Sequence, residues 1–197
     1  MIVRQTLQMT RLVDDLLDVG RITVGKIRLQ KEQVELKPIL DQAIETCRPV
    51  IERHQHTLEV TIPAEPLSLT ADAGRIAQVV SNLLNNAAKY MEDGGTIELT
   101  AELEEGMAVI AVRDKGIGIA AAMLPRVFDS FVQVESATGR ADGGFGVGLW
   151  LAKSFVQMHD GTIEARSDGE GAGSEFVVRL PATGVTSALL NKTAFQR

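Results

Sequence analysis

The segment ADGGFGVGL, residues 141–149, places four glycines within six positions and then runs into an apolar, helix-like stretch. Each glycine inside regular structure costs roughly 0.5–1 kcal/mol relative to alanine, so this loop has a use for bare backbone. A glycine-rich loop that opens a helix can turn its unpaired N–H groups toward an anion. The segment therefore indicates a phosphate-binding loop, with an ordinary flexible connection as the alternative on this segment alone.

Two other glycine-rich phosphate motifs do not fit the chain. A P-loop requires G-x-x-x-x-G-K-[ST], which occurs nowhere in the sequence. A dinucleotide fingerprint follows a strand and needs a third glycine where Leu149 stands. The pattern that remains is G-x-G-x-G-L, from Gly144 to Leu149.

Asparagines are unusually dense in the segment SNLLNNAAKY. Asn82 and Asn86 are four positions apart and share one helix face, and Lys89 and Tyr90 lie one turn further on. Asparagine costs roughly 0.5 kcal/mol in a helix relative to alanine, which suggests a use for the amides. An amide oxygen suits Mg²⁺, which takes few protein ligands beside phosphate oxygens and water. A merely solvated polar position is the alternative, and it fits Asn85 best.

A third segment, VRDKGIGI, places Asp114 directly after an apolar strand pattern and before Gly116 and Gly118. A carboxylate there can accept a hydrogen bond from an exocyclic amine such as that of adenine. The glycines would let a flat ring approach the backbone. In isolation, an ordinary aspartate at a strand-to-turn junction is the simpler interpretation.

The composition limits the partners of these segments. The chain has 197 residues, 45% hydrophobic and 23% charged, which is typical of one globular domain with an appendage. Its net charge of −6 argues against a nucleic-acid groove. A single cysteine, Cys47, excludes an internal disulfide framework and favours the cytoplasm. The sequence has no apolar run of about 18 residues and no signal-peptide pattern.

Hydrophobic periodicity predicts the elements that must position the three segments. Helical patterns cover residues 36–54, 73–90 (capped by Asp72), 120–128 and 147–159. Strand patterns cover residues 56–62, 67–72, a hairpin at 94–116 that turns at Glu105-Gly106, and a closing hairpin at 161–167 and 173–181. Alternating helices and antiparallel hairpins predict a two-layer α/β sandwich, with a mixed sheet covered on one face by helices.

The first 24 residues form a separate amphipathic pattern. Met9, Leu12, Leu16 and Val19 repeat at spacings of three, four and three, and Val13 and Leu17 widen the same face. A stripe of this kind predicts a helical partner, and a second copy of the chain would supply one. The alternative is that this helix packs on its own domain.

Together, in this order and spacing, the segments resemble the ATP-binding domain of sensor histidine kinases, in the GHKL (Bergerat) ATPase superfamily. The N box is matched by NLLNNAAKY, the glycine boxes by DKGIGI and GGFGVGL, and the phenylalanine box by VFDSF. The resemblance implies the second helix of a dimerisation and phosphoacceptor hairpin at residues 1–24. An ATP-binding catalytic domain of Bergerat fold would follow at 25–182, and a tail or linker at 183–197.

The resemblance also implies roles for the matching positions. Asp114 would bind the adenine amine, with Gly116, Gly118, Ile119 and Tyr90 shaping that side of the pocket. Asn86 would hold Mg²⁺. Asn82 and Lys89 would act on the metal and phosphates as the catalytic pair.

A lid and a second glycine box complete the implied site. Phe128 and Phe131 would anchor a mobile lid that runs to about Gly144, and Arg140 within it would contact phosphate. The glycine box would pass under the triphosphate, through the residues Gly144, Phe145, Gly146, Val147, Gly148 and Leu149.

The implied function is to bind Mg-ATP and donate the γ-phosphoryl group to a histidine of the dimerisation domain, for relay to a response-regulator aspartate. That histidine would lie on a helix preceding the given sequence, since His54, His56 and His159 lack the family's acceptor context. The implied partners are therefore ATP or ADP, the phosphoacceptor helix, a receiver domain and a second copy of the chain. The location would be cytoplasmic, with the parent protein soluble or membrane-anchored.

Three alternatives remain. Hydrolytic members of the superfamily use a glutamate as general base where this chain has Asn82, and an amide cannot deprotonate water. This favours a domain that holds ATP for transfer, although some kinases carry glutamate there. A non-catalytic module gated by nucleotide and an anti-sigma-factor kinase are the other two, and the N-terminal helix argues against the last.

Overall fold

A computed structural model describes residues 2–132 and 146–183; for residues 2–9, 11 and 12 it describes the backbone alone. The elements follow in the order α1 (Ile2–Thr23), β1 (Glu32–Glu35), α2 (Leu36–Arg53), β2 (Thr57–Thr61), β3 (Ser68–Ala71), α3 (Ala73–Lys89), β4 (Thr96–Glu104), β5 (Met107–Asp114), the 3₁₀ turn η1 (Leu124–Arg126), α4 (Gly148–Met158), β6 (Thr162–Arg166) and β7 (Ser174–Thr183).

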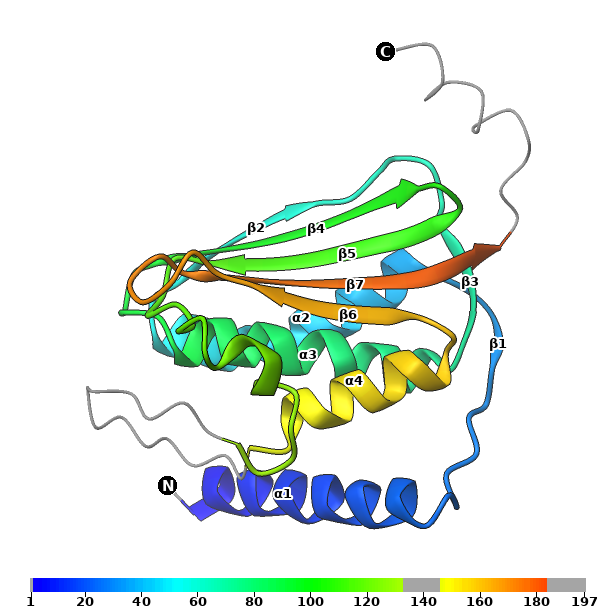
Figure 1. Cartoon of the computed structure of the whole chain (residues 1–197), viewed down its shortest axis with the longest axis horizontal. Helices are drawn as coiled ribbons and strands as arrows, with labels where there is room; N and C mark the ends of the chain where they lie inside the picture. Colours follow the sequence, from blue (N-terminus) through cyan, green and yellow to red (C-terminus); the bar gives the residue numbers. More distant parts are fainter. Residues whose placement is uncertain (1, 133–145, 184–197) are drawn as a thin grey trace.

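The strands form one mixed sheet in the order β1-β3-β7-β5-β4-β2, with β6 also paired to β7. The pair β2–β4 is parallel and the other described pairs are antiparallel. Helices α2, α3 and α4 lie against one face of this sheet (Figure 1). The predicted two-layer α/β sandwich is confirmed.

Alternating burial along the central hairpin explains why the helices cover only one face. In β4, Ile97, Leu99 and Ala101 are buried between less buried neighbours. Facing them, α3 buries an apolar stripe that includes Ile76, Val80, Leu83, Leu84 and Ala87. Burying each of the larger side chains contributes about 1.5–3 kcal/mol, so this layer fixes α3, which carries the asparagines, beneath β4 and β5.

The residues predicted from the sequence to begin or end a helix or strand do so in the structure. The Asp72 carboxylate accepts a hydrogen bond of 3.2 Å from the backbone N–H of Arg75, capping α3. The β4–β5 turn uses positive φ angles at Glu105 and Gly106.

Two predicted boundaries are corrected. The helix expected over 120–128 is only the turn Leu124–Arg126, because Pro125 would interrupt the backbone hydrogen bonds of a longer helix, and Ala121 and Ala122 stay exposed. The closing strand does not end at Pro181, because Ala182 pairs with Leu69 and Thr183 with Ser68.

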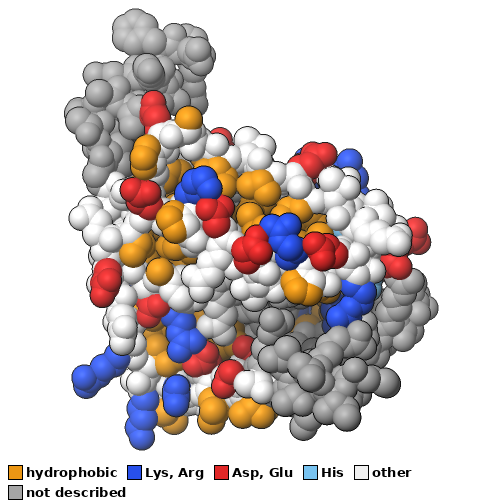
Figure 2. Space-filling view, turned by 180° about the vertical axis from the view of Figure 1, so that it is seen from behind, with side chains coloured by type: hydrophobic (Ala, Val, Ile, Leu, Met, Phe, Trp, Pro, Cys, Tyr) orange, Lys and Arg blue, Asp and Glu red, His pale blue; other side chains and the backbone are white. Residues whose placement is uncertain are grey.

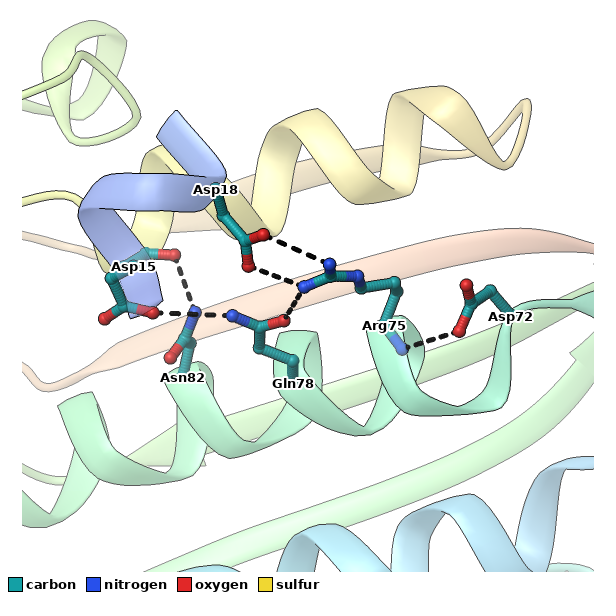
Figure 3. A network of polar contacts seen from close by, with 7 residues as sticks. Asp15, Asp18, Asp72, Arg75, Gln78 and Asn82 are labelled. Carbon is teal, nitrogen blue, oxygen red and sulfur yellow. Dashed lines mark hydrogen bonds and ion pairs between the residues drawn. The ribbon is translucent and has the colours of Figure 1, made fainter. Parts of the chain in front are cut away.

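Helix α1 rests on its own domain through acidic side chains (Figure 3). The Asp18 carboxylate pairs with the Arg75 guanidinium of α3 at 2.5 and 3.1 Å, and its side chain is only 8% exposed. Gln78 Nε2 donates to Asp15 Oδ1 at 3.4 Å. The acidic side of α1, which carries Asp15 and Asp18, is therefore the side that meets α3.

The apolar stripe of α1 is divided between core and surface. Val19 and Ile22 pack against the core, whereas Val13, Leu16 and Leu17 remain exposed at 54%, 42% and 52%. Hydrophobic side chains accordingly lie along the lower edge of the molecule, where α1 runs (Figure 2). No helix within the described residues combines the length and apolar character needed to cross a membrane.

Candidate functional site

Asp114 is the buried carboxylate at the end of β5. It is 5% exposed, and its Oδ1 accepts from the Gly116 N–H at 2.8 Å while its Oδ2 accepts from the Ser174 hydroxyl at 2.6 Å. Burial raises the pKa of Asp114 above its ordinary value, although the hydrogen bonds from Ser174 and Gly116 partly oppose this. The two donors fix the carboxylate in one orientation, as an acceptor at the strand end.

The glycines that follow Asp114 are required by close packing of the chain on itself. A Cβ at Gly116 would clash with the Tyr90 carbonyl, and one at Gly118, whose φ is +70°, would clash with the Gly169 carbonyl. Close packing of the chain is therefore a second reason for glycine at these positions, beside the predicted approach of a flat ring. The segment 115–119, here called the adenine loop after the role predicted for it, is held between the end of α3 and the β6–β7 connection.

The end of α3 brings the amides and the lysine to the adenine loop. Asn82 Nδ2 donates to the Gly148 carbonyl at 3.0 Å, which joins α3 to the first turn of α4. The Ile117 N–H donates to the Tyr90 carbonyl at 2.9 Å. Lys89 Nζ lies 5.0 Å from the Tyr90 ring centroid. Asn82 and Tyr90, at the two ends of the predicted N box, therefore contact the start of α4 and the adenine loop respectively.

Asn86 lies partly buried on α3, one turn beyond Asn82. The described residues include no group of three or more His, Cys, Asp or Glu side chains that could hold a metal ion. The donors available fit Mg²⁺ in the form in which it binds nucleotides, with an amide oxygen supplementing phosphate oxygens and water.

The two phenylalanines of the expected lid anchor differ. Phe128 is buried, with its ring edge-on to Phe176 at 6.2 Å and the Lys153 ammonium 5.7 Å above it. Phe131 is 60% exposed at a φ of +63°, and it is held by its backbone, whose N–H donates to the Gly146 carbonyl at 3.1 Å. Phe128 therefore anchors this region by its side chain and Phe131 by its main chain.

The second glycine box is described from Gly146 onward; Arg140, Gly144 and Phe145 lie outside the described residues. Gly146 has a φ of +70°, and a Cβ there would clash with the Val132 carbonyl. Val147 is buried, and α4 begins at Gly148 without a side-chain cap, while Leu149 packs against the core. An uncapped helix start presents its first N–H groups to any anion placed before it.

The three histidines form internal contacts. His159 is buried, and its Nδ1 donates to the Phe155 carbonyl at 2.7 Å while its Nε2 accepts from the Asp72 N–H at 2.9 Å. Burial lowers the pKa of His159 below its ordinary value, and a ring that accepts a hydrogen bond at Nε2 is in its neutral form. His54 contacts Asp93 and His56 contacts the Ala88 carbonyl.

Sequence reasoning missed the hydroxyl groups that support Asp114. Ser174 lies 60 positions from Asp114, and Ser167 bonds the adenine loop through the Ile119 N–H. The only signal available was the glycine-rich segment GEGAGSEF, whose three positive-φ glycines, Gly169, Gly171 and Gly173, mark a compact turn.

Residues 71–184 match the family model described as histidine kinase-, DNA gyrase B-, and HSP90-like ATPase. The chain belongs to this family. Among its relatives, the circadian input-output histidine kinase CikA of Thermosynechococcus vestitus is 35% identical over 173 residues, covering 87% of this chain and 24% of CikA. Sensor histidine kinase WalK of Bacillus subtilis is 34% identical over 179 residues, covering 90% of this chain and 29% of WalK. These matches identify a histidine kinase-like ATPase domain that spans about a quarter of the relatives' length.

Solved structures of the family share the fold. The mycobacterial sensor histidine kinase MprB matches with a TM-score of 0.67 at 26% identity, covering 77% of this chain and 97% of that one. Full-length ShkA in complex with AMPPNP matches with a TM-score of 0.76 at 27% identity, covering 89% of this chain and 36% of ShkA. The histidine kinase-like ATPase fold thus extends over most of the described chain.

Proposed function

We propose that this domain binds Mg-ATP and donates the γ-phosphoryl group to a histidine on the dimerisation hairpin of its parent kinase, for relay to a response-regulator aspartate. The observation that carries the proposal is the buried carboxylate of Asp114, which accepts two hydrogen bonds. It lies at the start of a loop that packs against the asparagine-bearing helix α3. The reaction draws on cytoplasmic ATP, which fits a chain whose single cysteine, Cys47, is buried.

The chain's own residues divide the work of holding the nucleotide. Asp114 would accept the adenine amine, and the Tyr90 side of the adenine loop would bound the ring. Asn86 would supply an amide oxygen to the metal, with Asn82, Lys89 and the start of α4 facing the phosphates. Mg²⁺, when bound, would neutralise charge on the phosphate oxygens, which is the main requirement of phosphoryl transfer.

The chemistry at Asn82 supports transfer over hydrolysis. An amide bonded to the Gly148 carbonyl offers no general base for activating water, a contribution typically worth about 10²–10⁴-fold. There are three competing functions: ATP hydrolysis as the main activity, a nucleotide-gated interaction module and an anti-sigma-type kinase. They differ in what becomes of the γ-phosphate.

The test is incubation of the chain with Mg²⁺ and γ-labelled ATP, with and without a separate helical hairpin that carries a family phosphoacceptor histidine. We expect label on the hairpin that is lost in acid and kept in base, as for phosphohistidine, and almost no phosphate release by the chain alone. The Asp114→Ala variant serves as the negative control.

The other outcomes separate the competing functions. Rapid phosphate release without the hairpin would overturn transfer in favour of hydrolysis. Calorimetric ATP binding with no label on hairpins from several relatives would overturn it in favour of a nucleotide-gated module. Label on a serine-bearing protein substrate, stable in acid, would favour the anti-sigma type.

We also propose that α1 pairs with a second copy along its exposed stripe. Its acidic side already contacts α3, which leaves Val13, Leu16 and Leu17 for a partner. Leu16→Glu should abolish self-association in light scattering, because a carboxylate in a helix seam loses hydration without gaining a partner. Val24→Glu, at another exposed apolar site just past the end of α1, is the control and should leave the oligomer intact. An unchanged oligomer in Leu16→Glu would contradict the pairing.

A further inference from the structure

The hydroxyl of Ser167 joins three segments of the chain at the back of the adenine loop. Its Oγ accepts from the Ile119 N–H at 3.0 Å and from the Gly169 N–H at 3.3 Å. Its single hydrogen has the Gly173 carbonyl as the nearest acceptor, at 2.7 Å, with the Gly169 carbonyl farther off at 3.2 Å. One donor and two acceptor sites are thus filled, which is the full capacity of a hydroxyl group.

The β6–β7 connection, residues 167–173, lies along the adenine loop as a second layer of backbone. Gly171 N–H donates to the Ile117 carbonyl at 2.7 Å and Gly173 N–H to the Gly116 carbonyl at 3.2 Å. The contact is so close that a Cβ at Gly118 would clash with Gly169. The adenine loop is therefore braced by backbone bonds to its neighbouring carbonyls of Gly116 and Ile117, and the Ser167 hydroxyl adds a side-chain bond to Ile119.

The brace continues to the Asp114 carboxylate. Gly173, which accepts from Ser167, is followed directly by Ser174, whose hydroxyl donates to Asp114 Oδ2. Gly116, which accepts from Gly173, donates in turn to Asp114 Oδ1. Both oxygens of the carboxylate are thus oriented by residues whose backbone depends on the connection that Ser167 organises.

We infer that Ser167 is a positioning residue that sets nucleotide affinity by holding the adenine loop and Asp114 in place, without contacting the nucleotide. The inference rests on the proposed function, since it takes Asp114 as the adenine acceptor. Removing the hydroxyl leaves the Ile119 N–H and the Gly173 carbonyl without their partner, which loosens the loop before ATP binds. Part of the binding free energy must then be spent on ordering the adenine loop, so the affinity for nucleotide falls.

The test compares Ser167→Ala with Ser167→Thr and with Ser68→Ala. Threonine keeps the hydroxyl at the half-buried position 167. Ser68→Ala removes another half-buried hydroxyl, from β3 where it pairs with Thr183 of β7. In calorimetry, Ser167→Ala should weaken ATP and ADP by the same factor, about three- to tenfold, and the other two variants should bind as the wild type does. Phosphoryl transfer at saturating ATP should be unchanged in all of them.

Amide hydrogen exchange gives a second measurement on the nucleotide-free protein. The Ile119 and Gly173 amides should exchange faster in Ser167→Ala and return to wild-type rates in Ser167→Thr. Wild-type nucleotide affinity in Ser167→Ala, even with faster exchange, would overturn this inference and leave the proposed function standing. Failure of the wild-type chain to bind nucleotide at all would instead overturn the proposed function, and this inference with it.

Discussion

Asp114→Ala is expected to weaken ATP and ADP binding by roughly 10- to 100-fold. The change removes a buried charged acceptor, and such hydrogen bonds contribute on the order of 1.5–3 kcal/mol, about one to two powers of ten in affinity. It also leaves the Ser174 hydroxyl and the Gly116 N–H without their acceptor. Isothermal titration calorimetry measures the loss. Asp41→Ala, which removes an exposed carboxylate from α2, should bind normally, and near-wild-type affinity in Asp114→Ala would remove the adenine role.

The ionised Asp114 carboxylate should lower the free energy of unfolding of the nucleotide-free protein at neutral pH. Because burial raises the pKa of Asp114 in the folded protein, its contribution is fully favourable below the ordinary value of 3.8 and is lost as pH rises through the higher folded value. Asp114→Asn, which cannot ionise, should therefore unfold at higher urea concentration than the wild type at pH 7. The difference should shrink as the pH falls below about 4. A variant less stable than the wild type at neutral pH would contradict this.

Asn86→Ala is expected to remove the gain in nucleotide affinity that Mg²⁺ confers. Asn86 is the chain's own proposed metal ligand, so its loss should lower affinity about tenfold in Mg²⁺, and phosphoryl transfer to the hairpin on the order of 10²-fold. With chelator present, wild type and variant should bind ATP equally.

Asn85→Ala is the matched control for this metal-dependent effect. It removes the same amide from the preceding position of α3, where the side chain points to a different side of the helix. Its affinity in Mg²⁺ should equal that of the wild type. An equal loss for Asn86→Ala with and without metal would remove the metal assignment.

Most of the fold could be predicted from local sequence patterns. The period of two in β4, the Asp72 cap and the Glu105-Gly106 turn each depend on neighbours within a few positions, so they could be predicted without tertiary information. The grouping of Asn82 with Asn86 followed from helix periodicity in the same way.

The support of the candidate site could not be predicted because its partners are distant in sequence. Ser174 reaches Asp114 across 60 positions, and Ser167 reaches Ile119 across 48. A serine in a turn has no spacing that reveals such a bond. The packing reason for Gly118 was hidden likewise, since it depends on a carbonyl of the β6–β7 connection.

The orientation of α1 was also beyond the sequence. Amphipathicity predicted the helix, but the side that docks is decided by Arg75, 57 positions after Asp18. The buried, paired carboxylate favours this face of the helix, because turning α1 would separate Asp18 from the Arg75 guanidinium.

The Asp18–Arg75 pair gives α1 a fixed angular setting on the ATP-binding domain. Apolar contacts such as those of Val19 tolerate a small rotation of the helix, but successive residues are about 100° apart, so a turn of one position would carry Asp18 away from the guanidinium. The ion pair thus fixes the rotation of α1 about its own axis relative to the domain. A partner bound along Leu16 would meet the domain at one defined angle, and a twist imposed on α1 would act first on Arg75, two turns before Asn82 on the same helix.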